Sequence, residues 1–297
     1  QQNQTYAENG LRVLAFGYRI LDSNSDLDEN EEENLVFLGM TAMMDPPREE
    51  SKAAVQSCIE AGIRPVMITG DHKITAAAIA KRIGILQEGD LVCEGADIDG
   101  MSDEDLEEYV ERVSVYARVA PEHKIRIVKA WQRKGNIVAM TGDGVNDSPA
   151  LKRADVGFAM GSGTEAAKEA GKIVILDDNF SSIKDAIWYG RTIYHNILKF
   201  CKFQLVINVT AVVVSAVAPF LGIEEPLKVT HLLFVNLVMD GLGAMMLGNE
   251  PALSKYMKEA PRRRDEGIIS KDMMTQIGFM GIWLVILSFL FLKLPVI

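Results

Sequence analysis

Ile137-Val-Ala-Met140 and, directly after it, Thr141-Gly-Asp-Gly-Val-Asn-Asp147 form the stretch that restricts the fold most. The four apolar residues predict a buried strand, and the acidic segment with its two glycines predicts a tight loop at the carboxyl end of that strand. Parallel-sheet enzymes bind their ligands outside the carboxyl ends of the strands. Asp143 and Asp147 offer the oxygen ligands that Mg²⁺ prefers, and the glycines let the backbone approach a phosphate. An ordinary acidic turn is the alternative, but the length of the pattern favours a magnesium and phosphate site.

Apolar segments alternate with segments of helical periodicity between Pro47 and about Asp178. Predicted helices cover residues 48–61, 75–82 and 124–134, and predicted strands cover residues 65–68, 137–140, 156–160 and 172–176, after two earlier strands at 11–19 and 35–39. This alternation predicts an α/β fold with a doubly wound parallel sheet. Right-handed crossovers place the ends of the strands at 65–68 and 137–140 on one edge of the sheet. We therefore expect Thr69-Gly-Asp71 and the Asp143–Asp147 loop to converge on one site.

Three long apolar runs, at residues 205–223, 229–247 and 273–292, dominate the last third of the chain. Each is about long enough to cross the hydrocarbon core of a bilayer. Basic residues precede the first run and follow the second, whereas the turn Ile223-Glu-Glu-Pro-Leu-Lys228 between these two runs is acidic. By the positive-inside rule, the basic flanks and the α/β part face the cytoplasm. Three buried helices of a soluble protein are the alternative, but the length and number of the runs favour an all-α transmembrane domain in a lipid bilayer.

Asp240 lies inside the second run, where a carboxylate is costly and marks a functional site by default. Asn236 lies four residues earlier, on the same face of a regular helix, and Asn208 lies in the preceding run. Oxygen ligands from two neighbouring helices suit part of a cage for a hard cation. For Asn208 alone, an interhelical hydrogen bond is the competing interpretation. Gly241 and Gly243 are expected to loosen the helix just after Asp240.

Composition narrows the class of partner. The formal net charge of −10 argues against a nucleic-acid partner and suits a protein that binds cations. The three cysteines, Cys58, Cys93 and Cys201, lack the spacing of metal ligands, and we interpret them as reduced, which fits exposure to the cytoplasm.

The Asp143–Asp147 loop resembles the hinge signature of the P-type cation-transporting ATPases, and three more segments follow the order of that family. Asp45-Pro-Pro-Arg48 resembles the hinge between the nucleotide-binding and phosphorylation domains. Met67-Ile-Thr-Gly-Asp71 resembles the second phosphate-site motif, and Arg118-Val-Ala-Pro-Glu-His-Lys124 resembles the segment with the phosphate-binding lysine. The resemblance implies a remnant of the nucleotide-binding domain with the hinge at residues 1–45, a haloacid-dehalogenase-like phosphorylation domain at 46–190 and transmembrane helices at 191–297.

The same resemblance implies roles for single residues in ATP-driven cation transport through an aspartyl-phosphate intermediate. The residues that it places around the phosphoryl group are Thr69, Gly70, Asp71, Lys124 and Asn146. It assigns Mg²⁺ to Asp143 and Asp147, the phosphates of ATP to Arg48 and Arg118, and the transported cation to Asn208, Asn236 and Asp240.

The resemblance favours Ca²⁺ as the transported ion. The sarcoplasmic-reticulum type of calcium pump has a Glu three residues after the Asn of the first span and a Thr just before the Asp of the second, where this chain has Ala211 and Met239. The surrounding segments resemble the plasma-membrane type, which implies one Ca²⁺ per ATP and a multi-pass protein of the plasma membrane with its catalytic domain in the cytoplasm. Mn²⁺, Na⁺ and H⁺ remain alternatives. A soft metal is disfavoured because no cysteine lies near Asp240 in the sequence.

Two family motifs have no counterpart in the 297 residues: the DKTGT string with the phosphorylated aspartate, and the TGE loop of the actuator domain. With a start at Gln1 and an end at Ile297, we expect the C-terminal portion of a larger pump, inactive alone and partnered by the upstream polypeptide. Two other classes stay open: a membrane-anchored phosphatase of the dehalogenase superfamily, and a non-catalytic membrane fragment or regulatory subunit. The phosphatase is disfavoured because an anchor needs neither Asp240 nor Asn236.

Overall fold

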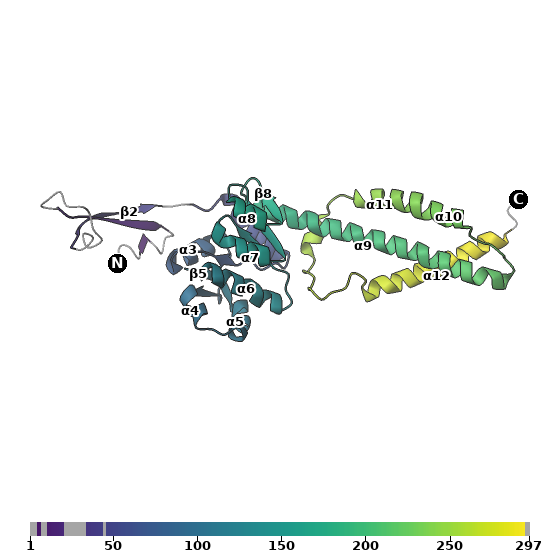
Figure 1. The fold of residues 1–297 in the computed structure, drawn as a ribbon, viewed down its shortest axis with the longest axis horizontal. Helices are drawn as coiled ribbons and strands as arrows, with labels where there is room; N and C mark the ends of the chain where they lie inside the picture. Colours follow the sequence, from purple (N-terminus) through teal and green to yellow (C-terminus); the bar gives the residue numbers. More distant parts are fainter. Residues whose placement is uncertain (1–4, 7–10, 21–33, 44–45, 295–297) are drawn as a thin grey trace. The chain divides into compact units, whose positions relative to one another are not determined.

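A computed structural model describes residues 5–6, 11–20, 34–43 and 46–294 of the chain (Figure 1). The chain forms two compact units. The first comprises residues 1–184 and the short segment Ala260–Arg264, and the second comprises residues 185–259 and 265–297. Asp45 and the acidic segment at residues 22–33 lie outside the described residues.

The first unit begins with an antiparallel pair of strands, β1 (Arg12–Tyr18) and β2 (Val36–Met43). Strand β1 coincides closely with the strand predicted at 11–19, whereas β2 begins near the predicted start at residue 35 and continues four residues past the predicted end at residue 39. The pairing register shifts between Phe16 and Gly17, where one strand carries a bulge or irregularity.

The rest of the first unit alternates strands with helices, as the sequence predicts. Its parallel strands are β3 (Met67–Ile68), β4 (Leu91–Glu94), β5 (Val113–Ala117), β6 (Ala139–Gly142), β7 (Val156–Met160) and β8 (Ile173–Ile175). Its helices are α2 (Glu49–Glu60), α3 (Lys73–Ile83), α4 (Gly95–Asp99), α5 (Asp103–Tyr109), α6 (Pro121–Arg133), α7 (Ser148–Arg153) and α8 (Glu165–Ala170). Short 3₁₀ turns lie at Val110–Arg112 and Val145–Asp147.

The predicted fold class is confirmed, but the strand pairing differs from a single sheet. The strands are hydrogen-bonded as two three-stranded parallel sheets, in the orders β3-β5-β4 and β6-β7-β8. Strand β3 is two residues long, so it offers few backbone groups for a second ladder. Its Ile68 packs against the core cluster around Val128 and Met140 and also against the cluster around Tyr116 and Ile127. Side-chain packing therefore connects the two sheets where ladder hydrogen bonds do not.

The segment from β4 to β5 was not predicted from the sequence, although it builds much of the core. Every residue of β5 is buried, and Tyr116 is among the largest fully buried side chains. Helix α6 begins at Pro121, three residues before the predicted start, because proline is well accommodated in the first turn of a helix. Lys124 is consequently the fourth residue of α6, whereas the prediction made it the first residue of the helix.

The second unit consists of long helices. Helix α9 runs from Phe180 to Val217, and a 3₁₀ turn (Ala218–Leu221) continues it. Next come α10 (Val229–Phe234), a π-helical segment (Val235–Met239) and α11 (Asp240–Gly248). A 3₁₀ turn (Ser254–Lys258) precedes α12 (Lys271–Lys293).

Three helical stretches in the described part of the chain are long and apolar enough to cross a membrane, by length and composition: Phe180–Leu221, Val229–Gly248 and Lys271–Lys293. Their outward faces carry large exposed apolar side chains, such as Val212, Leu237 and Phe279. Between the helices, Val206 of α9 packs against Met273 and Ile277 of α12. An apolar exterior around a small packed interior suits a lipid environment.

Candidate functional site

The loop after β6 is organised around the carboxylate of Asp147. Its Oδ2 accepts hydrogen bonds from the backbone N–H groups of Asp143, at 3.3 Å, and Gly144, at 3.2 Å. Its Oδ1 lies 2.5 Å from the ammonium nitrogen of Lys124 on α6. Both side chains of this ion pair are largely buried. The carboxylate therefore fixes the turn and holds the lysine at the carboxyl end of β6.

Gly142 is required for this arrangement because Asp147 folds back over it. A Cβ atom at position 142 would lie 2.4 Å from Cβ of Asp147 and 2.7 Å from its Cγ. Gly144 differs, since a Cβ there would meet Oδ2 of Asp147 at 3.6 Å, an ordinary contact distance. The first glycine of the loop is thus needed for close approach, and the second is not.

Asp143 has its backbone anchored and its side chain exposed. Its carbonyl oxygen accepts a hydrogen bond of 2.8 Å from the N–H of Thr164, at the start of α8. Among the described residues, no hydrogen bond or ion pair reaches the carboxylate of Asp143. That carboxylate is free to bind a cation, whereas the charge of Asp147 is already countered by Lys124.

These residues fit a Mg²⁺ ion that keeps part of its water shell. The described part of the chain contains no group of three or more His, Cys, Asp or Glu side chains that could hold a metal ion. Mg²⁺ is commonly bound through one or two carboxylates, water and the phosphate of a substrate. One free carboxylate at the end of a strand meets that requirement.

A second loop follows β3 and contains Thr69, Gly70 and Asp71. The Thr69 hydroxyl donates to Oδ2 of Asp71 at 3.0 Å, and the N–H of Asp71 donates to the Thr69 hydroxyl at 3.1 Å. Backbone bonds join this loop to the end of β5, where the N–H of Arg118 donates to the Asp71 carbonyl. Gly70 is exposed. The loop presents a hydroxyl and an open backbone segment at the end of a strand.

The structure brings some of the predicted phosphate-site residues together and leaves others apart. Lys124 and Asp147 are in contact, and the residues that precede the two loops, Ile68 and Met140, pack in one core cluster. Asn146 is exposed, and its side chain makes no hydrogen bond among the described residues. The remaining two predicted residues are arginines. Arg118 is exposed with a positive φ of 50°, and Arg48 donates to the Asp177 carbonyl at a long 3.4 Å.

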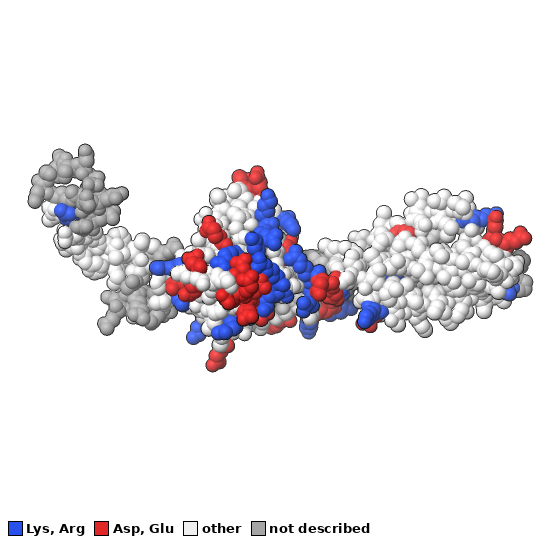
Figure 2. Space-filling model, turned by 60° about the horizontal axis from the view of Figure 1, so that its bottom comes forward, with Lys and Arg blue, Asp and Glu red and all other residues white. Residues whose placement is uncertain are grey.

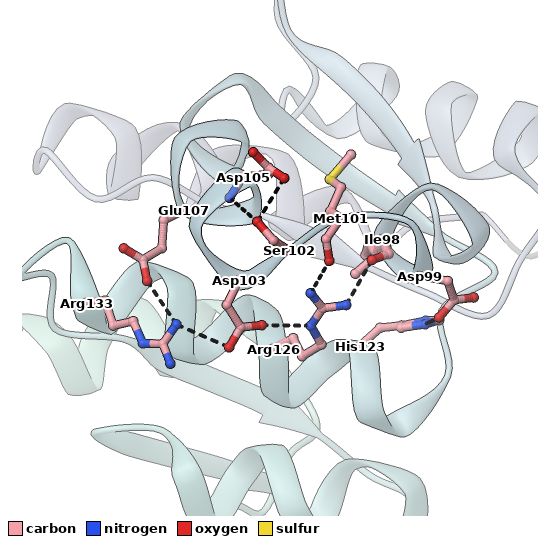
Figure 3. Close-up of polar contacts among 10 residues, drawn as sticks. All are labelled: Ile98, Asp99, Met101, Ser102, Asp103, Asp105, Glu107, His123, Arg126 and Arg133. Atoms are coloured by element: carbon pink, nitrogen blue, oxygen red, sulfur yellow. Dashed lines mark hydrogen bonds and ion pairs between the residues drawn. The ribbon is translucent and has the colours of Figure 1, made fainter.

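Helix α6 is held in place by a network that the sequence did not predict (Figure 3). Arg126 donates to the carbonyls of Ile98, at 2.8 Å, and Met101, at 2.6 Å, and to the carboxylate of Asp103, at 3.1 Å. His123, the residue before Lys124, lies 2.7 Å from Asp99 through its Nε2. Side chains on one face of α6 thus bond to the α4–α5 segment. These bonds hold the helix that carries Lys124 in place.

Charge pairing in this network shifts the pKa of an acidic group. The hydrogen bond from Arg126 is the largest cause that holds the pKa of Asp103 below its usual range, and a second hydrogen bond from Arg133 acts in the same direction. Arg133 also pairs with Glu107, at 3.0 Å, and this bond raises the pKa of the arginine. The ionised forms of Asp103 and Arg133 are therefore favoured in the folded chain.

The second candidate site lies in the long helices, around Asp240. This residue is 8% exposed, and its Oδ2 accepts a hydrogen bond of 2.6 Å from Nε2 of Gln204 on α9. Two buried oxygens, Oδ1 of Asp240 and Oε1 of Gln204, have no hydrogen-bond partner in the described part of the chain. Buried oxygens without donors are costly. This pair is suited to accept a cation.

The structure departs from the predicted cage at Asn208 and Asn236. Asn236 is exposed, whereas Asp240 is buried, and in the described residues neither asparagine forms a hydrogen bond to Asp240. The expected shared face assumes a regular α-helix, but the segment Val235–Met239 is a π-helix, in which the turn is wider. The irregular turn therefore lies before Asp240, not after it at Gly241 and Gly243 as expected.

Gln204 is the functional candidate that sequence reasoning missed. It lies four residues before Asn208, so both lie on one face of α9. The available signal was a polar amide directly before the predicted apolar run at 205–223. Asp240, its partner, is 36 residues further along the chain, and no local pattern connects the two.

Comparisons with known proteins identify family models that match each of the two units. Residues 4–155 match a family model described as haloacid dehalogenase-like hydrolase, and residues 125–187 match a second model with the same description. Residues 224–295 match a model described as cation transporting ATPase, C-terminus. The first two models cover the α/β unit, and the third covers α10, α11 and α12.

Curated relatives with similar sequences are named as calcium-transporting ATPases. The chain is 45% identical to calcium-transporting ATPase 1 of Lactococcus lactis over 94% of its own length and 32% of the relative. It is 46% identical to a calcium-transporting ATPase of Bacillus subtilis, over 90% of the chain and 30% of the relative. It is 43% identical to calcium-transporting ATPase 12, plasma membrane-type, of Arabidopsis thaliana, over 91% of the chain and 26% of the relative. The chain thus spans about a third of the length of the curated relatives it matches.

Proposed function

The chain belongs to the haloacid dehalogenase-like hydrolases and, among them, to the P-type cation-transporting ATPases, and from this premise we propose that it is part of an ATP-driven calcium pump. In this proposal, residues 46–190 form the phosphorylation domain, residues 191–297 contribute transmembrane helices, and residues 1–45 come from the nucleotide-binding domain and hinge. The whole protein would form an aspartyl phosphate on an aspartate outside these 297 residues, since the sequence contains no DKTGT string.

Phosphoryl transfer depends mainly on positioning and on neutralising the charge of the phosphoryl group. We assign Asp143 as a direct ligand of Mg²⁺, because its carboxylate is exposed and unpaired among the described residues. When bound, Mg²⁺ supplies positive charge next to the phosphoryl oxygens. Asp147 orients the loop and the ammonium group of Lys124, and Lys124 neutralises a phosphoryl oxygen when one is present.

The other phosphate contacts follow from the loop after β3. The backbone N–H of exposed Gly70 is a donor for the phosphoryl group, and the Thr69 hydroxyl becomes a donor when it releases its hydrogen bond to Asp71. Asp71 orients Thr69 through their mutual hydrogen bonds. We place Asn146 at the same group, and we assign Arg48 and Arg118 to the phosphates of ATP.

The membrane site is assigned to a hard cation because of the two unpartnered oxygens. Oδ1 of Asp240 and Oε1 of Gln204 are buried acceptors, and Ca²⁺ is bound in proteins by oxygen ligands of this kind. Asn208 and Asn236 are further candidate ligands, which reach the ion only after movement of the side chain or the π-helical segment. Ca²⁺ is favoured over Mn²⁺, Na⁺ and H⁺ because the relatives are named as calcium-transporting ATPases.

One Ca²⁺ per ATP is part of the same proposal. Ala211 and Met239 stand where a second site would need oxygen-bearing side chains, and neither residue supplies one. We further propose a plasma-membrane location with the α/β unit in the cytoplasm, on the basis of the basic residues that flank the apolar runs.

The decisive experiment uses the whole protein that contains this chain. It is incubated with γ-labelled ATP and Mg²⁺, with or without micromolar Ca²⁺, and the acid-stable, hydroxylamine-labile phosphoenzyme is measured. We expect phosphoenzyme only with Ca²⁺, and none in the Asp240→Asn variant at any Ca²⁺ concentration. Phosphoenzyme without Ca²⁺ would overturn the ion assignment. Hydrolysis of phosphate esters without phosphoenzyme formation from ATP would favour the membrane-anchored phosphatase instead.

A further inference from the structure

A basic pocket lies on the first unit, away from the residues assigned to phosphoryl transfer. It is open, has a volume of about 450 Å³ and is lined by Lys129, Gln132, Arg133, Arg153 and Arg264. Four of these five side chains are cationic. All five residues belong to the first unit. The face of the molecule in Figure 2 shows Lys and Arg side chains gathered in a band on this unit, beside Asp and Glu side chains.

Three separate segments supply the residues of the basic pocket. Lys129, Gln132 and Arg133 lie at positions i, i+3 and i+4 of α6, on one helix face, and Arg153 is the last residue of α7. Arg264 comes from the segment Ala260–Arg264. Its backbone N–H donates to the Gly135 carbonyl at 3.2 Å, and its guanidinium lies 2.9 Å from Asp155. The pocket is therefore a packed feature of the unit and not a chance approach of mobile side chains.

Positive charge in the basic pocket exceeds the negative charge that pairs with it. Arg133 is paired with Asp103 and Glu107, and Arg264 is paired with Asp155. Among the described residues, neither Lys129 nor Arg153 has an ion pair. Cationic side chains that converge on a concave surface raise the local concentration of anions. An anionic ligand would complete the pairing.

Within the residues that the structure describes, the side-chain oxygen of Gln132 lacks a hydrogen-bond donor, which a ligand in the pocket could supply. The side chain is 8% exposed, and its Nε2 donates to the Arg153 carbonyl and to Oδ2 of Asp155, both at 3.1 Å. Its Oε1 is buried and has no partner in the described part of the chain. A ligand with an O–H group would satisfy this oxygen once the amide turns toward the pocket. Inorganic hydrogen phosphate carries both negative charge and an O–H near neutral pH, whereas a phosphate monoester, with a second pKa of about 6, keeps its O–H only in the monoanionic form, and sulfate carries no O–H.

We propose that the basic pocket binds a phosphate group through Lys129, Arg133, Arg153 and Arg264. Free inorganic phosphate and the headgroup of an anionic lipid such as phosphatidic acid present the same chemistry. The site is separate from the Lys124–Asp147 pair, because it uses the second half of α6 and the end of α7. The test of this site measures binding and therefore does not depend on pump activity.

The competing explanation is structural. Arg133 and Arg153 are the last residues of α6 and α7, where cations are stabilised by the helix dipole without any ligand. That explanation predicts no saturable binding of inorganic phosphate or of phosphatidic acid, so titrations with these two compounds separate the two interpretations.

The experiment is calorimetric titration of the full chain, held in phosphatidylcholine nanodiscs with a chelator to exclude Mg²⁺, with inorganic phosphate and then with sulfate. We expect saturable binding of phosphate and affinity for sulfate lower by about fivefold or more. Lys129→Gln/Arg153→Gln should weaken phosphate binding by about tenfold or more. The matched control, Lys52→Gln/Lys152→Gln, removes the same charge from exposed positions on α2 and α7 and should change the affinity by less than about twofold. The variant Lys124→Gln should keep the binding, which separates this site from the phosphoryl-transfer site.

A second titration identifies the source of the group, with dihexanoyl phosphatidic acid against dihexanoyl phosphatidylcholine. Binding of phosphatidic acid alone supports a lipid headgroup, and binding of inorganic phosphate as well supports a site that free phosphate can fill. The proposal is overturned if neither phosphate compound binds, or if the control pair of substitutions weakens binding as much as the pocket pair.

Discussion

The ammonium group of Lys124 lies 2.5 Å from Oδ1 of Asp147, while the other oxygen of the same carboxylate accepts two backbone N–H groups of the loop after β6. One carboxylate thus connects helix α6 to the turn that follows the strand. The pair is largely buried, so removal of either partner leaves the other charge unpaired and with little access to solvent. Lys124 and Asp147 should therefore behave as one energetic unit.

A double-mutant cycle tests this coupling. Lys124→Met and Asp147→Asn should each lower the free energy of unfolding by roughly 2 kcal/mol, and the double variant should lose less than the sum, with a coupling of about 1–3 kcal/mol. The measurement is urea unfolding in mild detergent, followed by Trp131 fluorescence in a Trp188→Phe/Trp283→Phe background, which leaves one tryptophan in the chain. The exposed pair Glu165–Lys168 is the control, with an expected coupling below about 0.5 kcal/mol. Equal coupling in both pairs would contradict the assignment.

Gly142→Ala should destabilise the α/β unit through steric overlap with Asp147. The new Cβ would lie 2.4 Å from Cβ of Asp147, so the loop must shift and lose its bonds to the carboxylate. We expect a loss of about 1–3 kcal/mol in the same unfolding assay. Gly144→Ala is the matched control, because its Cβ has room, and it should change the free energy of unfolding by less than about 0.5 kcal/mol. If the two variants lose the same stability, close approach at Gly142 is not the cause.

The hydrogen bond from Arg126 is expected to control the pKa of Asp103. Arg126→Gln removes the largest cause of the lowered pKa, so the pKa of Asp103 should rise, and Arg133→Gln should raise it by less. The measurement is carbon-13 NMR of the Asp103 carboxyl group as the pH falls, assigned with Asp103→Asn. A larger rise in the pKa of Asp103 in Arg133→Gln than in Arg126→Gln would show that Arg126 is not the main cause of the lowered pKa.

The same pair gives a pH dependence of stability with a defined sign. The folded-state pKa of Asp103 is lowered, so its stabilising contribution is present above the unfolded pKa of about 3.9 and is lost as the pH falls through the folded pKa. In acid unfolding curves, the stability difference between the native chain and Arg126→Gln should therefore shrink below about pH 4. A difference that grows as the pH falls would contradict this linkage.

The sequence predicted elements whose signal is local. The apolar run before Asp143 predicted a buried strand at 137–140, whereas β6 lies two residues later, at Ala139–Gly142, and Ile137 is exposed. Strand β7 lies where it was predicted, at Val156–Met160. Strand β5 was missed because its five residues follow a short acidic helix and a 3₁₀ turn, and no alternating pattern separates them from their surroundings. Fold class follows from repeated local patterns, whereas the pairing of strands depends on packing between residues far apart in the chain.

In the candidate sites, too, single residues could be predicted from local patterns, whereas contacts between distant residues could not. Lys124 and Asp147 were both predicted, but their direct contact across 23 residues was not. Arg126 donates to the backbone carbonyls of Ile98 and Met101. These bonds could not be predicted, because every residue has a carbonyl and the sequence does not show which ones are bonded. At Asp240, the assumption of a regular helix placed Asn236 on the same face, and the π-helical segment removed the basis for that placement.

Gln204 should control the affinity of the membrane site, because its Nε2 holds Oδ2 of Asp240 at 2.6 Å and its Oε1 is a free buried acceptor. In the whole protein, Gln204→Leu should raise the Ca²⁺ concentration for half-maximal phosphoenzyme by about tenfold or more, the equivalent of one hydrogen bond to a charged group. Thr210→Val is the matched control, since among the described residues the Thr210 hydroxyl donates to the Val206 carbonyl of the same helix and not to Asp240. It should change that concentration by less than about twofold. Equal shifts in both variants would mean that Gln204 acts through helix packing, whereas a shift confined to Gln204→Leu places it at the ion.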